Sequence, residues 1–367
     1  MAAELLRLHG QLLFPTLYYH PDIAFQTRQR YMHRGTHRIL RLSNCSLSER
    51  SCESLASVLV FQFGSLRELN LSNNNLHDSG VKLLSVGVGS PHCKLDTLSL
   101  SGCLITEEGC TSLISALSSN PSHLKELDLS YNHPGDSGIK LLSAGLKDPR
   151  WRLDTLRVEP AGVRWLRPGL RKYSCQLTID TNTVHTNLQL SDNNRRVTRV
   201  EEVQSYPDHP DRFDVCHQLL CRNGLTGRCY WEVEWRGRAD ISVSYRRIRR
   251  KGNSDDCLFG RNDQSWSLDS SDDGPRFVWH SNRRTPIFSS FSSSSSSVSN
   301  RVAVYVDCPA GTLSFYRVSS DTLIHLHTFN TTFTETLYPG FTVWSRPSGS
   351  SVSLCECKEC PPVRETL

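Results

Sequence analysis

Leucine recurs every 29 residues through the segment 37–158, and this periodicity restricts the fold more than any other feature of the chain. A second leucine phase and a turn phase keep the same interval, and the turn phase alternates between cysteine and asparagine. The first phase consists of Leu40, Leu69, Leu98, Leu127 and Leu156, and the turn phase of Cys45, Asn74, Cys103 and Asn132. A unit this short cannot bury its own apolar face, so the segment is expected to stack its units into a solenoid.

Each unit follows the pattern L-x-x-L-x-L-x-x-(N/C)-x-L, which predicts a strand, a turn and a helix. Alternating leucines place one face of the strand inward, and Asn or Cys satisfies buried backbone groups in the turn. The stretches that follow, such as 81–84 and 110–113, are expected to form helices on the outer side. The pattern resembles leucine-rich repeats of the ribonuclease-inhibitor type, which implies an α/β solenoid of about four repeats over residues 37–158. Residues 1–36 do not follow the period and are unassigned.

The side chains between the strand leucines are expected to face the concave side of the solenoid. They include no aromatic residue, although Trp, Tyr and Arg dominate the hot spots of protein interfaces. One column consists of Arg41, Asn70, Ser99, Asp128 and Arg157, and the next of Ser43, Ser72, Ser101 and Ser130. We therefore expect the repeats to act as a scaffold, and whether their concave face binds anything stays open.

The character of the sequence changes after Trp165, with residues 159–172 as the expected linker. Short β-rich runs now alternate with turns rich in Gly, Asp, Asn and Pro, which predicts an antiparallel sandwich. The run Tyr230–Trp235 alternates apolar residues with acids, a pattern typical of a strand with one buried and one wet face. Further strands are expected at 188–190, 241–245, 265–268, 276–280, 302–306, 313–318 and 352–355.

Six segments of this half resemble, in order, the motifs of PRY-SPRY domains. They are 177–185 (LTIDTNTVH), 212–214 (RFD), 227–233 (GRCYWEV), 266–268 (WSL), 304–316 (VYVDCPAGTLSFY) and 337–341 (LYPGF). The resemblance covers residues 173–357 and implies an all-β sandwich of two antiparallel sheets, followed by a tail at 358–367. Repeats of this type running into a PRY-SPRY domain resemble the C-terminal region of fish NOD-like receptors (the NLR family). That resemblance implies a cytoplasmic, non-enzymatic recognition protein of innate immunity, although the chain contains no G-x-x-x-x-G-K-[ST] nucleotide-binding loop.

The expected binding site lies on two charged segments that we place on loops of the sandwich. Members of the family bind protein partners through loops at one end of the domain, and recognition in general concentrates on loops. The basic segment carries Arg246, Arg247, Arg249, Arg250 and Lys251, and the acidic segment carries Asp269, Asp272 and Asp273. Such opposed clusters can steer a partner and fix its register. The alternative is that they pair with each other or with water, which contributes only about 0–1 kcal/mol per exposed pair.

Composition and motifs argue against several other classes of protein. The net charge of +5 is a slight surplus, whereas nucleic-acid binding requires a concentrated basic face. No apolar stretch is long enough to span a bilayer. The repeat cysteines fit small buried side chains better than disulfides or metal ligands, so we expect thiols in a reducing compartment. We find no catalytic motif, and the cysteines at 355–360 have no second ligand cluster nearby, so we expect no catalytic residue, cofactor or metal.

The expected partner is a protein or a microbial ligand, whose identity the sequence leaves open together with the oligomeric state. Two alternative interpretations remain. Fish venom cytolysins end in similar PRY-SPRY domains, so the chain could be toxin-associated, and a short array of repeats could also be a non-functional fragment of a larger receptor lacking a nucleotide-binding module.

Overall fold

The computed structural model describes residues 31–34, 37–61, 66–121, 123–271, 276–287, 300–319, 322–344 and 349–355. The chain divides into two compact units, Met1–Lys172 and Tyr173–Leu367, which are described separately below. No helix among these residues has the length and apolar character required to cross a membrane.

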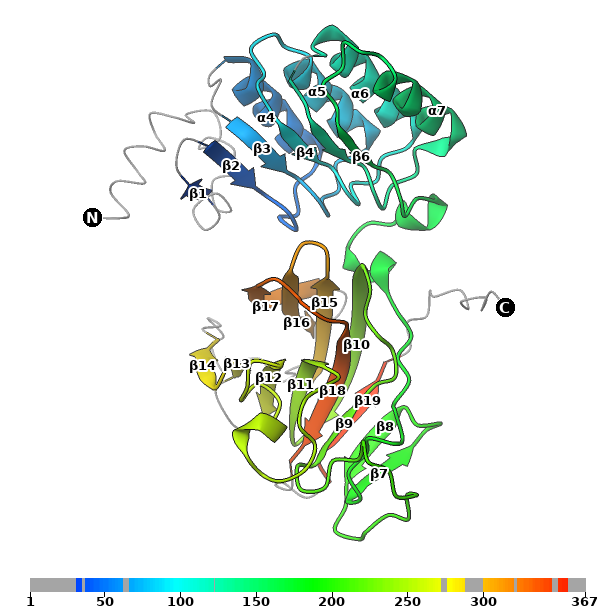
Figure 1. The fold of residues 1–367 in the computed structure, drawn as a ribbon, viewed down its shortest axis with the longest axis vertical. Coiled ribbons are helices and arrows are strands. Elements are labelled where there is room, and N and C mark those ends of the chain that lie inside the picture. The colour runs from blue at the N-terminus through cyan, green and yellow to red at the C-terminus, as the bar shows by residue number, and fades with distance from the viewer. Residues whose placement is uncertain are drawn as a thin grey trace, which may run out of the picture. The chain divides into compact units, whose positions relative to one another are not determined.

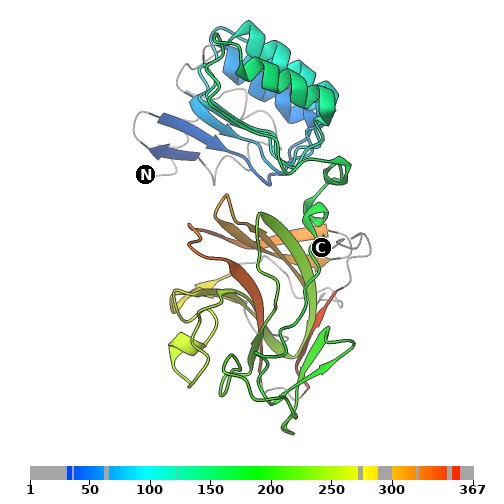
Figure 2. The ribbon, with the colours of Figure 1, turned by 45° about the vertical axis from the view of Figure 1, so that its right-hand side comes forward.

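The first unit is a solenoid in which strands β2 to β5 are each followed by a helix on the outer side (Figures 1 and 2). Strands β2 to β6 pair in parallel and align the leucines of the first phase, from Leu40 through Leu69 and Leu98 to Leu156. The predicted leucine-rich-repeat architecture is therefore confirmed. The strands are β2 (His37–Arg41), β3 (Leu66–Asn70), β4 (Thr97–Ser99), β5 (Glu126–Asp128) and β6 (Thr155–Arg157), with β1 (Tyr31–Arg34) antiparallel to β2. The helices are α4 (Glu49–Phe61), α5 (His77–Val88), α6 (Glu107–Ser119) and α7 (Gly135–Leu146).

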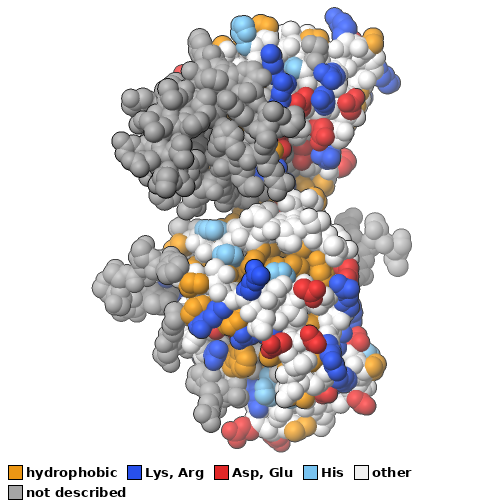
Figure 3. Space-filling view, turned by 60° about the vertical axis from the view of Figure 1, so that its left-hand side comes forward, with side chains coloured by type: hydrophobic (Ala, Val, Ile, Leu, Met, Phe, Trp, Pro, Cys, Tyr) orange, Lys and Arg blue, Asp and Glu red, His pale blue; other side chains and the backbone are white. Residues whose placement is uncertain are grey.

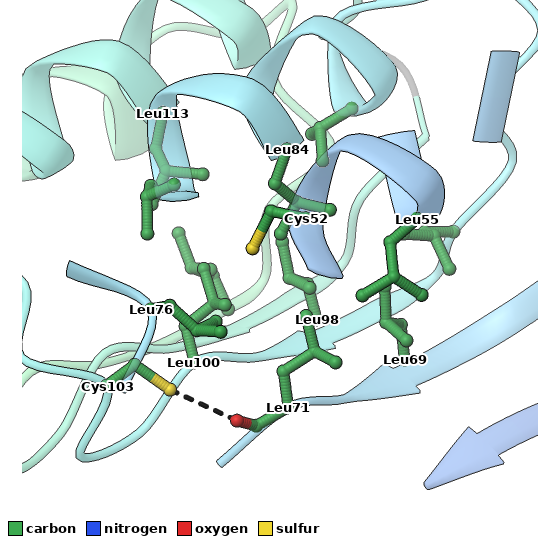
Figure 4. Close-up of a cluster of buried hydrophobic side chains, with 14 of the residues drawn as sticks. Cys52, Leu55, Leu69, Leu71, Leu76, Leu84, Leu98, Leu100, Cys103 and Leu113 are labelled. Atoms are coloured by element: carbon green, nitrogen blue, oxygen red, sulfur yellow. Dashed lines mark hydrogen bonds between the residues drawn. The ribbon is translucent and has the colours of Figure 1, made fainter. Parts of the chain in front are cut away.

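The core of the solenoid lies between the strands and the helices. Figure 4 shows the strand leucines pointing toward helix side chains such as Leu84 and Leu113, and all of these side chains are buried. Neighbouring helices approach closely because a glycine stands at their contact: a Cβ atom at Gly87 would lie 2.8 Å from the Ala56 carbonyl oxygen. Cys52 and Cys103 are buried within the same cluster, as expected for small apolar side chains.

Asparagine at every second turn connects two successive turns of the solenoid. Asn132 Oδ1 accepts hydrogen bonds from the backbone N–H of Cys103 (2.9 Å) and Ile105 (3.1 Å). Its Nδ2 donates to the carbonyls of Leu100 and Leu129. Asn74 makes the equivalent set of four bonds two turns earlier, with Cys45, Leu47, Leu42 and Leu71. The alternation of Asn and Cys thus has a structural cause, because each asparagine satisfies the backbone of the preceding cysteine turn as well as its own.

We expect Asn132→Ala to destabilise the first unit by about 2–3 kcal/mol, because it leaves several buried backbone groups without a partner. Hydrogen exchange of peptides that cover β4 and β5 measures this loss. Cys103→Ala is the matched control: it removes one thiol hydrogen bond, to the Leu71 carbonyl at 3.1 Å, and is expected to cost about 1 kcal/mol or less. Equal losses for the two variants would contradict the account of the turn.

The segment 159–172, expected as a linker, packs onto the last repeats of the first unit. The Tyr131 N–H donates to the Pro160 carbonyl, and the Gly162 N–H donates to the Asn132 carbonyl. Trp165, in the short helix η1 (Val163–Trp165), is buried with its ring edge-on to Tyr131 at 4.9 Å. A second short helix, η2 (Leu170–Tyr173), ends at the boundary between the units.

The second unit consists of two antiparallel sheets, as predicted, and a large apolar core lies between them (Figures 1 and 2). One sheet runs in the order β17 (Thr322–Asn330), β16 (Thr312–Ser319), β15 (Arg301–Asp307), β10 (Arg228–Arg236), β19 (Ser351–Leu354), β8 (Arg196–Arg199) and β7 (Leu188–Ser191). The other runs β14 (Arg283–Pro286), β13 (Phe277–His280), β12 (Ser265–Ser271), β11 (Arg238–Tyr245), β18 (Leu337–Val343) and β9 (Gln218–Leu220).

Strand β10 differs in part from its predicted pattern of one buried and one wet face. Trp231, Val233 and Trp235 point into the core, but Tyr230 and Glu232 on the opposite face are buried as well. The reason is a layer of polar contacts on this face. The Tyr230 hydroxyl donates to Glu232 Oε1, and Glu232 Oε2 pairs with Arg301 at 2.7 Å.

Candidate functional site

The outer face of the six-stranded sheet is covered at one end and accessible at the other. Phe213, Leu220, Ile248 and Phe259 form a small second core over the covered end. Gln218 fixes this cover, since its Nε2 donates to the Cys257 carbonyl (2.8 Å) and its Oε1 accepts from the Phe259 N–H. At the accessible end, the pairing of β11, β12 and β13 brings carboxyl and aromatic side chains together.

Two aspartates stand side by side at the accessible end. Asp240 of β11 is the cross-strand partner of Asp269 on β12, and Asp269 in turn is paired with Phe277 on β13. Two residues further along β13, on the same face, Trp279 is paired with Arg284 of β14. Trp344, which follows β18, donates from its indole Nε1 to Asp240 Oδ1 at 3.0 Å. We call the set Asp240, Asp269, Phe277, Trp279 and Trp344 the carboxylate–aromatic patch.

Burial raises the pKa of both carboxyl groups of the patch. Burial, and next the neighbouring Asp269, raises the pKa of Asp240 to about 7, and the hydrogen bond from Trp344 lowers it only in part. Burial also raises the pKa of Asp269, although Arg238 and Arg284 oppose the shift. Arg238 pairs with Asp269 Oδ2 at 3.5 Å. Among the described residues, no group hydrogen-bonds to Asp269 Oδ1, which is itself buried.

Arginines stack on the aromatic rings of the patch. The guanidinium carbon of Arg261 lies 3.2 Å from the ring centre of Trp279, and that of Arg284 lies 3.3 Å from the ring centre of Phe277. Phe277, Trp279 and Trp344 are all partly exposed. Figure 3 turns the β12–β14 side of the second unit toward the viewer and shows hydrophobic and basic side chains intermixed there. Tryptophan and arginine around a desolvated polar centre are the composition of an interface hot spot.

The structure places three of the predicted basic residues in contacts within the domain. Arg246 donates to Asp180 Oδ2 (3.0 Å) and to Asp211 Oδ2 (3.2 Å). Arg250 donates to the Arg246 and Ile248 carbonyls, and Lys251 donates to the Arg212 carbonyl at 3.0 Å. These side chains fasten the segment 180–214 to the loop that follows β11. Their predicted role in binding stays a prediction.

The other predicted binding residues do not share one location in the domain. Arg247 and Arg249 are exposed, and Arg247 pairs with Glu335 at 2.7 Å. Asp269 lies within β12, so its placement on a loop was wrong: the register with β11 continues to Ser271. Asp272 and Asp273 lie outside the described residues. No ion pair between described residues joins the basic segment to Asp269.

Sequence reasoning missed Asp240, Trp279 and Trp344. A signal for Asp240 was present, since it faces away from Ala239 and Ile241, on the side of β11 that otherwise carries Arg238, Ser242 and Ser244. Trp279 likewise alternates with the buried Val278. The sequence does not give the pairing register of β11, β12 and β13, and this register is what places their side chains next to one another.

The concave face of the solenoid is occupied largely by internal contacts. Arg41 pairs with Glu68 at 2.9 Å, Asp96 pairs with Lys125 at 2.9 Å, and Arg157 lies 3.9 Å from Glu126. The serine columns hydrogen-bond along the sheet, as in Ser101 to Ser130 (2.6 Å). Many polar side chains of the concave face are therefore already paired within the solenoid.

Comparison with known families supports the division of the chain. Residues 177–225 match the SPRY-associated domain (PRY), residues 228–357 match the SPRY domain, and residues 65–85 and 120–143 match a leucine-rich repeat. The chain therefore carries leucine-rich repeats followed by a PRY-SPRY domain. In the described part of the chain, no group of three or more His, Cys, Asp or Glu side chains is arranged to hold a metal ion.

Similar proteins come from different functional classes. Stonustoxin subunit beta of Synanceia horrida is 38% identical over 177 residues, which are 48% of this chain and 24% of the toxin subunit. Ribonuclease inhibitor of Sus scrofa is 46% identical over 121 residues, 33% of this chain and 26% of the inhibitor. The crystal structure of the TRIM65 PSpry domain covers 51% of this chain and 94% of that chain, at 24% identity and a TM-score of 0.44. The chain spans about a quarter of the length of the two curated relatives.

Proposed function

We propose that this chain is a non-enzymatic protein-recognition module of the innate-immune receptor type, in which the PRY-SPRY domain binds a protein or microbial ligand and the repeats serve as scaffold. PRY-SPRY and leucine-rich-repeat domains together suggest a protein-interaction module. The observation that carries the proposal is the carboxylate–aromatic patch, where the paired carboxyl groups of Asp240 and Asp269 lie beside partly exposed aromatic side chains.

A partner would complete this site chemically. The Asp269 side chain is 15% exposed, and its Oδ2 lies 3.5 Å from Arg238, so a donor from a partner can add a hydrogen bond at this carboxyl group. A basic side chain is the best fit, because it pairs with the carboxyl group and lowers its pKa toward the charged form. Phe277, Trp279 and Trp344 then supply apolar area around the donor, and their contact with the partner excludes water from it.

The immune-receptor assignment and a cytoplasmic location are the finer parts of the proposal. They are supported by the order of the two domains, which resembles the C-terminal region of fish NOD-like receptors.

The experiment compares proteins captured from a teleost cell lysate by the full chain and by the variants Asp269→Ala and Trp279→Ala. Asp269→Ala is the sharper variant, because it removes a carboxyl group with an unsatisfied oxygen, and its ion-pair partner Arg238 is 44% exposed, so we expect little change in thermal stability. We expect both variants to lose at least 90% of the capture of a partner that the wild type retains, since a hot-spot residue contributes about 2 kcal/mol or more.

Two further variants locate the site. Glu202→Ala changes an exposed carboxylate elsewhere on the domain and is expected to bind like wild type. The double variant Arg247→Glu/Arg249→Glu tests the basic segment. Loss of capture in this double variant together with full capture by Asp269→Ala would move the site to the basic segment and reject the patch.

A toxin-associated function is the second candidate, and the 38% identity to stonustoxin subunit beta favours it. It predicts that the purified chain releases haemoglobin from erythrocytes, alone or with a stonustoxin subunit. The recognition proposal predicts no release in either case.

A further inference from the structure

Three cysteines, Cys175, Cys229 and Cys308, lie near the first residues of strand β10, away from the carboxylate–aromatic patch. Cys229 is the second residue of β10. Cys175 lies beside this strand, because Ser174 forms a bridge with Tyr230 and the Cys175 N–H donates to the Tyr230 carbonyl at 2.9 Å. Cys308 follows β15, and its N–H donates to the Gly227 carbonyl at 2.8 Å. All three side chains pack on the core of the sandwich.

The Cys175 thiol lies within hydrogen-bond reach of the Cys229 sulfur, and this proximity lowers the pKa of Cys229 despite its burial. The backbone holds the two thiols near each other, because the Cys175 sulfur lies 3.6 Å from the carbonyl oxygen of Tyr230, the residue after Cys229 in β10. Cys308 differs from Cys229, since burial and the nearby Cys229 raise the pKa of Cys308 to about 12. The thiolate is the reactive form of cysteine, so Cys229 is the nucleophile of the group.

A metal does not account for this cluster, because no described set of three ligating side chains has the arrangement that a metal ion requires. Packing alone does not account for it either. Isolated core cysteines such as Cys110, whose pKa is raised to about 12 chiefly by burial, have the opposite shift. A nucleophilic thiol with a second thiol against it is the arrangement of a redox-sensitive dithiol.

We propose that Cys175 and Cys229 form a peroxide-reactive dithiol that closes to a disulfide and fastens the segment at 173–175 to β10. The Cys229 thiolate attacks one oxygen of hydrogen peroxide, the O–O bond breaks, and the leaving hydroxide takes up a proton to form water. Cys229 is then a sulfenic acid. The Cys175 sulfur attacks it, the S–S bond forms as the S–O bond breaks, and a second water leaves. Two thiols lose two electrons, and one peroxide becomes two waters.

The disulfide would close a loop that contains the whole PRY segment, since PRY covers residues 177–225. Oxidation therefore restricts the opening of this segment from β10 and is expected to raise the thermal midpoint of the second unit. The structure thus assigns to the domain a modification site that lies apart from its partner surface.

The test treats the full chain with an equimolar amount of hydrogen peroxide, blocks the remaining thiols with an alkylating agent, and maps disulfides by mass spectrometry without reduction. Every version carries Cys357→Ser and Cys360→Ser, because these two cysteines lie outside the described residues. We expect a cross-linked peptide containing Cys175 and Cys229. Cys175→Ser is expected to accumulate a sulfenic acid on Cys229 that dimedone traps, and Cys229→Ser to form neither product.

Cys308→Ser is the matched control, since it removes the third sulfur of the cluster and is expected to leave the Cys175–Cys229 cross-link unchanged. A cross-link between Cys229 and Cys308, a cross-link that disappears in Cys308→Ser, or full alkylation of Cys175 and Cys229 after peroxide would each overturn the proposal. The measurement on the chain that keeps Cys175, Cys229 and Cys308 does not depend on whether any one of their variants folds.

Discussion

Arg228→Ala is expected to destabilise the second unit by about 3–5 kcal/mol, the cost of removing one partner from a buried ion pair. Arg228 Nε donates to Asp307 Oδ2 at 2.8 Å, and both side chains are about 5% exposed. Burial alone would lower the pKa of Arg228, but Tyr305, Tyr173 and Asp307 raise it well above its usual range. The variant leaves the Asp307 carboxylate buried with only the Tyr305 hydroxyl and the Ala310 N–H as partners.

Urea unfolding followed by tryptophan fluorescence measures this loss, since five of the seven tryptophans belong to the second unit. Arg247→Ala is the matched control. It breaks an ion pair of the same type, but its partners Arg247 and Glu335 are 59% and 38% exposed, so we expect a loss of about 0–1 kcal/mol. Comparable losses in the two variants would show that burial does not set the strength of these pairs.

Asp240→Asn is expected to remove most of the contribution that the carboxylate–aromatic patch makes to the pH dependence of the free energy of unfolding. The pKa of Asp240 is about 7 in the folded domain and 3.8 in its ordinary environment. Between these values the folded state holds a proton that the unfolded chain releases, so stability falls as pH rises. At 1.36 kcal/mol per unit, the loss from pH 4 to pH 7 is at most roughly 4 kcal/mol.

Asparagine keeps an oxygen for the Trp344 indole but carries no titrating proton. The variant should therefore match the wild type at pH 4 and exceed its stability at pH 8 by up to roughly 4 kcal/mol. Hydrogen exchange of peptides from β11 and β12 at both pH values, corrected for intrinsic exchange rates, measures the difference within the second unit. A variant that is less stable than wild type at pH 8 would show that Asp240 is ionised and well paired in the folded domain.

The solenoid was predictable from sequence because its interactions repeat with the sequence period. The 29-residue interval placed Leu40, Leu69 and Leu98 on neighbouring strands, and the structure pairs them. The interval also identified Asn132 as a turn residue. It did not reveal that one asparagine serves two turns, because that depends on how far its side chain reaches into the preceding repeat.

The sandwich was predictable as a fold, but its site was not. Alternation located β11 and β12, whereas the contact of Asp240 with Asp269 depends on the register between them. The prediction chose Arg246 and Lys251 as binding residues because a high density of charged residues can be recognised from the sequence alone. Their intramolecular partners, Asp180 and the Arg212 carbonyl, are 66 and 39 positions away and could not be identified from the sequence.

The most direct test of the recognition proposal is hydrogen–deuterium exchange of the full chain with and without a partner captured through the wild-type domain. The account predicts slower exchange in β12, β13 and β14, at 265–271, 277–280 and 283–286, and little change in the β7–β8 hairpin at 188–199. Protection confined to the hairpin or to the solenoid, with unchanged exchange across β12–β14, would contradict it.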